Sequence, residues 1–380
     1  MTAAALRQPT PSFSTRLDAA RAAGTLPHDL TESDPARCGL GWEPRELERL
    51  LAARAGENGP AVLGEAREAV ASYLAGHGVA VPPDRVFFAP SRSAALRLAL
   101  DAVGGADGEV LVPAPARPLP EPGEPTPRHR TPYRLAFEGA WRLDRRSIRR
   151  AIGPRTRAVV VGNPAAPTGA MLDDRELTFL DELGAARGLA LVADEGLLDT
   201  AAERAVSVGR AGRALALHVS GLSGVCGLGG IGGAWIAVAG PAALADRAAS
   251  RLALRCEAAP AEVRPALPAL PALLARRGPS LERVRARLAR NRAAIATASL
   301  REAPWTMQWG AGGHAAVIQV NPVQDLDALC LALLDEGVAV RPGALDGLPP
   351  HGHLVVSLLP EPQVFDAGLE RLERALRRGW

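Results

Sequence analysis

Two arginine side chains in this sequence could bind a small acidic molecule, and one aspartate is a further candidate ligand contact. Arg92 and Arg117 each end in a guanidinium group, which can hold a carboxylate or phosphate through two parallel hydrogen bonds. Asp194 directly follows a predicted apolar strand, so its carboxylate is either paired with a nearby arginine or kept as a ligand contact. The two arginines could equally form ordinary salt bridges in a protein so rich in arginine. The sequence leaves these alternatives open.

The chemistry of a lysine amine is absent from this chain. All 44 basic residues are arginine, and none of the 380 positions is lysine. The side-chain amine that can both add to an aldehyde and act as a base is therefore missing. The composition is rich in alanine, glycine, proline and arginine, so codon bias in a GC-rich genome is by itself an adequate explanation.

Composition argues against several other classes of protein. The formal charge of +3 is small for this length and only 4% of residues are aromatic, so nucleic-acid binding is not indicated. No apolar run is long enough to span a membrane. The four cysteines contain no CxxC pair and the histidines show no metal-ligand spacing, so no metal site is predicted. We expect a cytoplasmic protein.

Apolar runs alternate with amphipathic stretches, which is the pattern of a mainly parallel sheet flanked by helices. The predicted strands of this sheet are residues 86–89, 109–113, 158–161, 190–193, 215–219 and 233–238. The predicted helices are residues 45–55, 64–76, 93–103, 144–152, 174–187, 242–254, 281–299 and 325–336. Apolar runs at 315–320 and 354–358 predict a second, smaller sheet. Repeated prolines in residues 113–127 exclude a regular helix and favour a polyproline-like surface connection.

Five motifs occur in a characteristic order along the chain. They are DLTESDP at 29–35, NPAAPTG at 163–169, ADE at 193–195, SGLSGVCGL at 220–228 and RPG at 341–343. In this order they resemble the class I/II aminotransferases of the fold-type I pyridoxal-phosphate superfamily. The resemblance covers nearly the whole chain and implies an α/β fold: a large domain with a mainly parallel sheet flanked by helices, plus a smaller α+β domain. We expect an N-terminal segment (1–45) that joins the small domain, a large domain (46–270) and a C-terminal small domain (271–380).

The resemblance also implies a pyridoxal phosphate site, which this sequence matches only in part. In the family a lysine forms a Schiff base with the cofactor, an aspartate faces the pyridine nitrogen, and hydroxyls at a helix N-terminus hold the phosphate. The matching positions are Asp194 for the aspartate and Ser91, Ser93 and Ser223 for the hydroxyls. Other positions depart from the family pattern. Arg117 stands where the family has a stacking aromatic, and Ala166 and Leu197 stand where it has an asparagine and a tyrosine that bind the ring hydroxyl. Gly224 stands at the lysine position, Gly232 at that of the phosphate-binding cation and Val355 at that of the substrate-carboxylate arginine.

These departures predict no internal aldimine and no ordinary pyridoxal-phosphate-dependent transamination, with noncovalent cofactor binding weak or absent. Our leading expectation is a noncatalytic or regulatory partner subunit, in a homodimer or in a heterodimer with an active homologue. The family builds its sites across a two-fold interface, so an inactive chain can still shape its partner's pocket. The alternative is an enzyme that reuses the emptied cleft at Arg92, Arg117 and Asp194 for a small acidic ligand. A pyridoxal-phosphate-dependent transaminase ranks third, because it needs a lysine.

Overall fold

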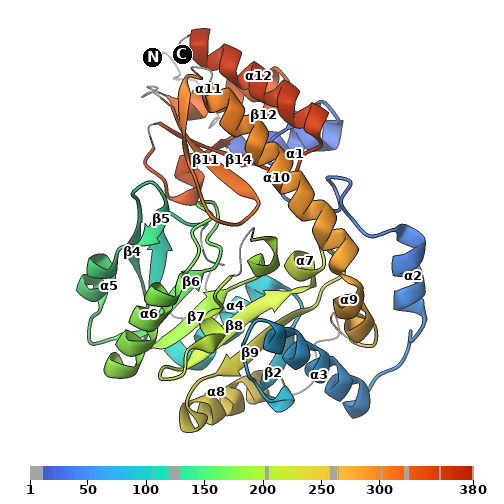
Figure 1. The fold of residues 1–380 in the computed structure, drawn as a ribbon, viewed down its shortest axis with the longest axis vertical. Helices are drawn as coiled ribbons and strands as arrows, with labels where there is room; N and C mark the ends of the chain where they lie inside the picture. Colours follow the sequence, from blue (N-terminus) through green and yellow to red (C-terminus); the bar gives the residue numbers. More distant parts are fainter. Residues whose placement is uncertain are drawn as a thin grey trace, which may run out of the picture.

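A large mixed sheet with helices on both faces forms the lower part of the molecule as drawn in Figure 1. The computed structural model describes residues 12–378, apart from residues 106, 118, 120–128, 202–204, 257–262, 264, 301–302, 321–324 and 351. Within these residues the sheet has eight strands in the order β2-β9-β8-β7-β6-β3-β4-β5. The strands are β2 (Val86–Ala89), β3 (Glu109–Ala114), β4 (His129–Phe137), β5 (Trp141–Leu143), β6 (Thr156–Gly162), β7 (Ala190–Asp194), β8 (Ala216–Gly221) and β9 (Ala234–Ala239). The run from β4 through β3, β6 and β7 to β8 is parallel, which confirms the predicted fold class.

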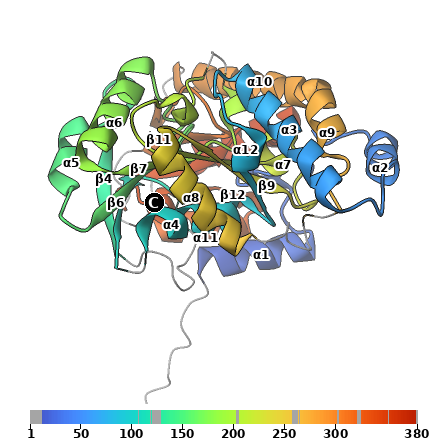
Figure 2. The same cartoon turned by 90° about the horizontal axis from the view of Figure 1, so that it is seen from below.

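Helices cover both faces of this sheet, because its strands are apolar on both sides. In β6, Val159 and Val161 pack into one core, whereas Ala158 and Val160 pack into the other. The first core is covered by α3 (Pro60–Gly76), α5 (Arg145–Ala151), α6 (Asp174–Arg187) and α9 (Leu270–Arg276). The second core is covered by α4 (Arg92–Gly104) and α8 (Ala242–Arg255), as Figures 1 and 2 show.

The segment from α6 to β7 illustrates how local sequence positions the strand ends. The Asp173 carboxylate accepts a hydrogen bond from the Glu176 N–H, and the Glu176 carboxylate accepts one from the Asp173 N–H, which fixes the start of α6. The helix ends at Gly188, whose φ of 64° is a left-handed conformation that glycine adopts without strain. The chain then enters β7 directly, and β7 ends at Asp194.

A second sheet lies above the first in Figure 1 and is antiparallel. Within the described part of the chain its order is β10-β11-β14-β13, with β10 (Trp305–Gln308), β11 (Ala315–Val320), β13 (Arg341–Pro342) and β14 (His353–Ser357). The long helix α10 (Gly278–Leu300) runs from the region of α9 to this sheet. Two further helices, α11 (Leu326–Asp335) and α12 (Pro362–Arg378), pack on it.

The N-terminal segment belongs to the same core as the C-terminal elements. Phe13 and Leu17 of α1 (Phe13–Ala23) pack in one cluster with Leu329 of α11 and Phe365 of α12. The short strand β1 (His28–Asp29) also pairs in parallel with β12 (Val338–Ala339). The described N-terminal elements, α1 and β1, thereby pack against the C-terminal elements. The exact domain boundaries after residues 45 and 270 stay predictions.

Strand β4 was not expected from the sequence, because Pro132 lies within it. Proline cannot donate a hydrogen bond, so it is tolerated in a strand only where no neighbour needs the donor. Pro132 pairs with Val112 of β3 on one side, whereas β5 pairs only with residues 135–137 of β4 on the other. Most of the proline-rich connection before β4, residues 118 and 120–127, lies outside the described residues. No helix in the described ranges is long and apolar enough to cross a membrane.

Candidate functional site

A cavity of about 650 Å³ lies between the two sheets, at the carboxyl ends of β6 and β7. This size suits a small molecule, and ligands of open α/β sheets bind outside the carboxyl ends of the parallel strands. From the large sheet and its helices the lining includes Arg92, Ser93, Arg117, Asp194, Ser223 and Gly224. From the second sheet it includes His314, Ala315, Arg341 and Val355. The cavity therefore brings together the singled-out site residues except Ser91 and Gly232.

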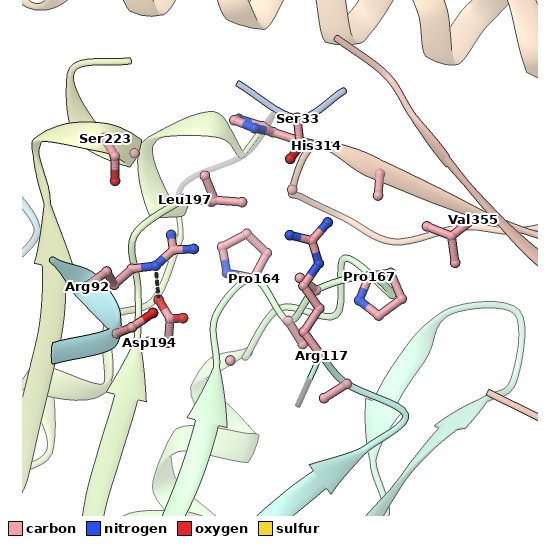
Figure 3. A pocket seen from close by; sticks show the side chains of 18 of the residues that line it. Ser33, Arg92, Arg117, Pro164, Pro167, Asp194, Leu197, Ser223, His314 and Val355 are labelled. Carbon is pink, nitrogen blue, oxygen red and sulfur yellow. Dashed lines mark ion pairs between the residues drawn. The ribbon is translucent and has the colours of Figure 1, made fainter. Parts of the chain in front are cut away.

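Asp194 and Arg92 form an ion pair in this cavity (Figure 3). The Asp194 Oδ1 lies 3.4 Å from the Arg92 Nε, and the two side chains are 34% and 35% exposed. The end of β7 supplies Asp194, and the first turn of α4 supplies Arg92. The glycine at 196 makes room for the arginine, because a Cβ there would lie 2.3 Å from its Nη1. The negative charge of Asp194 is thus balanced by Arg92. Because both side chains are partly exposed, this ion pair does not stabilise the fold strongly.

The serines around the start of α4 divide between two roles. The Ser91 hydroxyl accepts a hydrogen bond from the Ala94 N–H at 3.1 Å and so caps the helix. Ser91 does not line the cavity, whereas Ser93 and Ser223 do. Of the three predicted phosphate-binding hydroxyls, these two are therefore the ones placed where a ligand could reach them.

Arg117 enters the cavity from the segment after β3, and its backbone N–H is held by the Ala166 carbonyl at 3.0 Å. The Arg117 Nε lies 3.8 Å from the fully buried Asp346, which the Arg341 Nε holds more closely at 2.7 Å. Burial lowers the pKa of Arg117; the Asp346 charge opposes this shift, and the neighbouring guanidinium groups of Arg341 and Arg92 add to it. Sequence reasoning missed the Arg341–Asp346 pair, although it singled out the motif at 341–343.

Gly224 lies inside the short helix α7 (Leu222–Val225), against the backbone of Gly196. A Cβ built at this position would lie 1.7 Å from the Gly196 carbonyl oxygen. The present backbone therefore has no room for any side chain at the position where the resemblance implies a lysine. At three other cavity positions the resemblance implies a polar side chain, but this sequence has an apolar one. These positions are Ala166, Leu197 and Val355.

The residue after Asp194 has a structural role behind the cavity. Glu195 is fully buried and accepts hydrogen bonds from the Asn163 amide at 2.8 Å, the Ser207 hydroxyl at 2.5 Å and the Val208 N–H at 2.7 Å. Its second oxygen also lies 2.6 Å from Nδ1 of the buried His218. Burial alone would raise the pKa of Glu195, but hydrogen bonding and charge from His218, with the other donors, hold it below the ordinary value.

His314 is a cavity residue that sequence reasoning did not select. It lies just before β11, is 8% exposed, and its Nε2 has no hydrogen-bond partner. Burial is the main cause that lowers the pKa of His314 from 6.5 to about 4. The charges of Arg92 and Arg117 lower it further, while a hydrogen bond with the Ser33 backbone opposes the shift. Among the described residues no group of three or more histidine, cysteine, aspartate or glutamate side chains is placed to hold a metal ion.

The His314→Gln variant is expected to lose less stability in acid than the wild-type protein. Between pH 6.5 and pH 4 the unfolded chain protonates His314 and the folded chain does not, so folding becomes less favourable as the pH falls through this window. The measurement is the Tm of both proteins at pH 6.5 and pH 4, with His129→Gln as a control at an exposed histidine. An equal acid-induced drop in the wild type and the His314 variant would contradict this assignment.

The fold is closely similar to those of solved aminotransferases. Alanine aminotransferase from Pyrococcus furiosus superposes with a TM-score of 0.84 at 21% identity, covering 96% of each chain. N-Succinyldiaminopimelate aminotransferase from Mycobacterium tuberculosis has a TM-score of 0.78 at 22% identity, covering 99% of this chain and all of that one. The chain thus has the fold of these aminotransferases, with a cavity between two sheets. The sequence profile named "Aminotransferase class I and II" matches residues 52–372, so the chain belongs to that family.

Curated relatives align with only part of this sequence. The probable N-succinyldiaminopimelate aminotransferase DapC of Mycobacterium tuberculosis is 40% identical over 68 residues, which is 18% of this chain and 17% of DapC. The glutamate-pyruvate aminotransferase AlaA of Escherichia coli is 30% identical over 132 residues, covering 34% of this chain and 33% of AlaA. The chain thus matches about a third or less of the length of these relatives, and their named activities do not transfer with the fold.

Proposed function

We propose that this chain is a noncatalytic or regulatory member of the class I and II aminotransferases that does not perform Schiff-base transamination. The observation that carries the proposal is Gly224. It supplies no amine, its surroundings leave no space for a Cβ, and no lysine exists elsewhere in the 380 residues to replace it. Without the amine, neither covalent attachment of the cofactor nor proton transfer by a lysine is available.

The remaining residues also fit pyridoxal phosphate poorly. The carboxylate that would face a protonated pyridine nitrogen, Asp194, already faces the Arg92 guanidinium. Ala166 and Leu197 offer no hydrogen-bond donors for the ring hydroxyl, and Arg117 replaces the stacking aromatic with a cation. A cofactor would have to displace the arginine and would gain few polar contacts in return. We therefore propose that noncovalent binding of the cofactor is weak or absent.

The test of this proposal is reductive trapping. The purified protein is mixed with pyridoxal phosphate, treated with borohydride and analysed by intact-protein mass spectrometry. We expect no mass increase, whereas a lysine-bearing family member treated alongside gains one cofactor. A stoichiometric adduct that maps to the cavity would overturn the proposal. An adduct at the N-terminal amine alone would leave it standing, and peptide mapping separates the two sites.

The partner role supports a second measurement. Family members build their sites across a two-fold interface, so a noncatalytic chain can act on the pocket of a neighbouring subunit. We expect the chain to form a homodimer, or to form a heterodimer with a lysine-bearing homologue whose activity then changes. Size-exclusion chromatography with light scattering, alone and with that homologue, measures this directly. A strictly monomeric chain that leaves the homologue unchanged would refute the partner role.

A second candidate function is an enzyme that works in the same cavity without pyridoxal phosphate. The observation in its favour is that Arg92 and Arg117 both direct guanidinium groups into the space (Figure 3). Asp194 and Ser223 are the further polar groups placed there. This candidate ranks second because the arrangement supplies cations to bind an acid but no activated nucleophile. Screening for turnover of small acids by the protein alone tests it.

A further inference from the structure

Helix α5 carries a dense group of positive charges on the surface of the protein. Four of its seven residues are arginines, namely Arg145, Arg146, Arg149 and Arg150, and all four are exposed. Together they form the α5 arginine surface. Figures 1 and 2 show this helix at the outer edge of the molecule, next to α6. None of the four residues lines the cavity between the two sheets, so this charge belongs to a separate part of the protein.

Among the described residues, no carboxylate forms an ion pair with these four arginines, because the acidic groups around them are engaged elsewhere. Asp144, the residue just before α5, caps the helix and lies 3.0 Å from the Arg134 Nη2. On the adjoining helix α6, Glu182 lies 3.4 Å from the Arg213 Nη1. The guanidinium groups of the α5 arginine surface are therefore available to carboxylates of another molecule.

Helix stability does not explain this concentration of charge. The first turn of α5 contains Arg145 and Arg146 and no acidic residue, although the positive end of the helix dipole disfavours cations there. Arg149 and Arg150 suit the negative end of the dipole, but each lies four positions after another arginine, a spacing at which like charges repel. Charges that oppose local stability are typical of functional surfaces. The arrangement therefore indicates a binding role.

Packing against α6 holds part of this surface in place. The guanidinium carbons of Arg145 and Arg149 lie 5.3 Å and 5.1 Å from the centre of the Phe179 ring. The ring is only 7% exposed, whereas both arginines are exposed, so the two side chains cover the ring from the solvent side. A guanidinium group that is already positioned loses less side-chain entropy when it forms hydrogen bonds. The surface is thus partly pre-organised for binding.

The residues around α5 favour one class of acidic partner. A membrane-binding helix inserts apolar side chains, but the exposed large hydrophobic residues of the described chain, Leu254, Leu300 and Leu345, all lie outside α5 and α6. Single-stranded nucleic acid stacks on exposed aromatic rings, and Phe179 is buried. With a rise of about 1.5 Å per residue, α5 is about 10 Å long, which is about a third of a turn of duplex DNA. An acidic polypeptide fits this small surface best.

The spacing of the arginines also suits carboxylates on one face of a polypeptide. Arg146 and Arg150 are four positions apart, so they lie about 6 Å apart along the helix axis. Alternate side chains of an extended chain are about 7 Å apart, and side chains four positions apart on a helix are about 6 Å apart. Each guanidinium group can bind one carboxylate through two parallel hydrogen bonds.

We propose that the α5 arginine surface binds an acidic segment of a partner protein, with glutamate or aspartate side chains along one face of the segment. The carboxylates of this segment bind the guanidinium groups of α5 from the solvent side. This inference goes beyond the proposed function, because it assigns a partner to a surface outside the cavity and does not depend on the loss of the lysine.

The test is fluorescence anisotropy of labelled probes titrated with the full-length protein. The main probe is an oligoglutamate peptide, and an oligoglutamine peptide of the same length is the uncharged reference. We expect only the oligoglutamate peptide to bind, and we expect added salt to weaken its binding because salt screens exposed charges. A DNA duplex and vesicles of anionic lipid are titrated in parallel. If either binds the α5 arginine surface more tightly than the peptide, the assignment to a polypeptide is wrong.

A double variant locates the binding on α5. Arg146→Gln combined with Arg150→Gln removes two charges and keeps both arginines that cover Phe179. We expect it to weaken oligoglutamate binding about 2- to 30-fold, the effect of losing two exposed ion pairs. Its Tm should not fall, because repulsion between like charges is relieved. The matched control is Arg371→Gln combined with Arg374→Gln, at two exposed positions of α12, which changes the net charge equally and should leave binding unchanged.

Three further results would overturn the inference. If the oligoglutamate peptide does not bind at millimolar concentration, α5 is not a site for acidic polypeptides. If both double variants weaken binding equally, the net charge and not the α5 arginine surface is responsible. A lower Tm of the α5 variant would show that its arginines stabilise the fold, which contradicts the argument for a binding role. All three are independent of reductive trapping, because no arginine of α5 lines the cavity. The two proposals therefore fail separately.

Discussion

Replacing Gly224 with alanine is expected to lower the free energy of unfolding by about 1–3 kcal/mol, the usual effect of overpacking. The added Cβ would lie 1.7 Å from the carbonyl oxygen of Gly196 and 2.6 Å from its carbonyl carbon. Because both atoms belong to the backbone, no side-chain rotation can relieve the overlap. Either α7 or the segment after β7 must move. The measurement is the midpoint of urea unfolding, with the Tm as a second readout.

Gly64→Ala is the matched control for this prediction. Gly64 is also helical, in α3, but nothing lies within 4 Å of its would-be Cβ. Alanine there is expected to be neutral, or to stabilise by about 0.5–1 kcal/mol through its better helix propensity. The two variants differ only in the space around the added carbon. Equal midpoints for both would mean that the backbone at Gly224 yields more easily than the structure indicates.

The same contact makes a lysine at this position doubly unfavourable. Gly224→Lys adds the identical Cβ, so it carries the same overlap with Gly196 before its amine reaches the cavity. Even a folded variant would lack the ring and phosphate contacts that other family members supply. We therefore expect Gly224→Lys to form no trapped cofactor adduct. The absence of a lysine at position 224 occurs together with the close packing of α7 against Gly196. A single substitution of Gly224 therefore does not restore a cofactor site.

The grouping of the candidate site was predictable, but its internal pairing was not. The resemblance placed Arg92 and Asp194 where other family members meet their cofactor, so their approach was expected from it. Their ion pair depends on the missing side chain of Gly196, which leaves space for the Arg92 guanidinium. His314 and Arg341 come from the second sheet. Its placement over the first depends on packing between distant segments, which no local pattern encodes.

The fold shows the same division between local and distant information. Strand β7 was predicted to within one residue, since a short apolar run bounded by polar residues specifies a buried strand. Helix α12 was not predicted, although Phe365, Leu369 and Leu372 are buried at the spacing of one helix face. Strand β4 was not predicted, because Pro132 is tolerated in it only where the neighbouring strand β5 leaves β4 unpaired. That condition is a property of the sheet and not of the segment.

Removing the Glu195 carboxylate is expected to have the largest effect on stability of any single change proposed here. Glu195→Ala would leave the Val208 N–H, the Asn163 amide and the His218 ring without their buried acceptor. Each buried donor left without an acceptor costs about 1–3 kcal/mol. Glu195→Gln keeps the shape and part of the hydrogen bonding, so its loss should be smaller. Glu48→Gln, at an exposed position of α2 (Pro44–Ala52), is expected to change nothing.

The pH dependence distinguishes loss of the charge from loss of packing. Because the folded state lowers the pKa of Glu195, its ionised form stabilises the protein fully above the ordinary glutamate pKa, about 4.3. This contribution disappears as the pH falls through the lower, folded-state pKa. The advantage of the wild type over Glu195→Gln should therefore be constant near neutral pH and shrink in acid. Urea midpoints of both proteins from pH 7 to pH 3 measure it, and an advantage that grows in acid would show that Glu195 is buried in its protonated form.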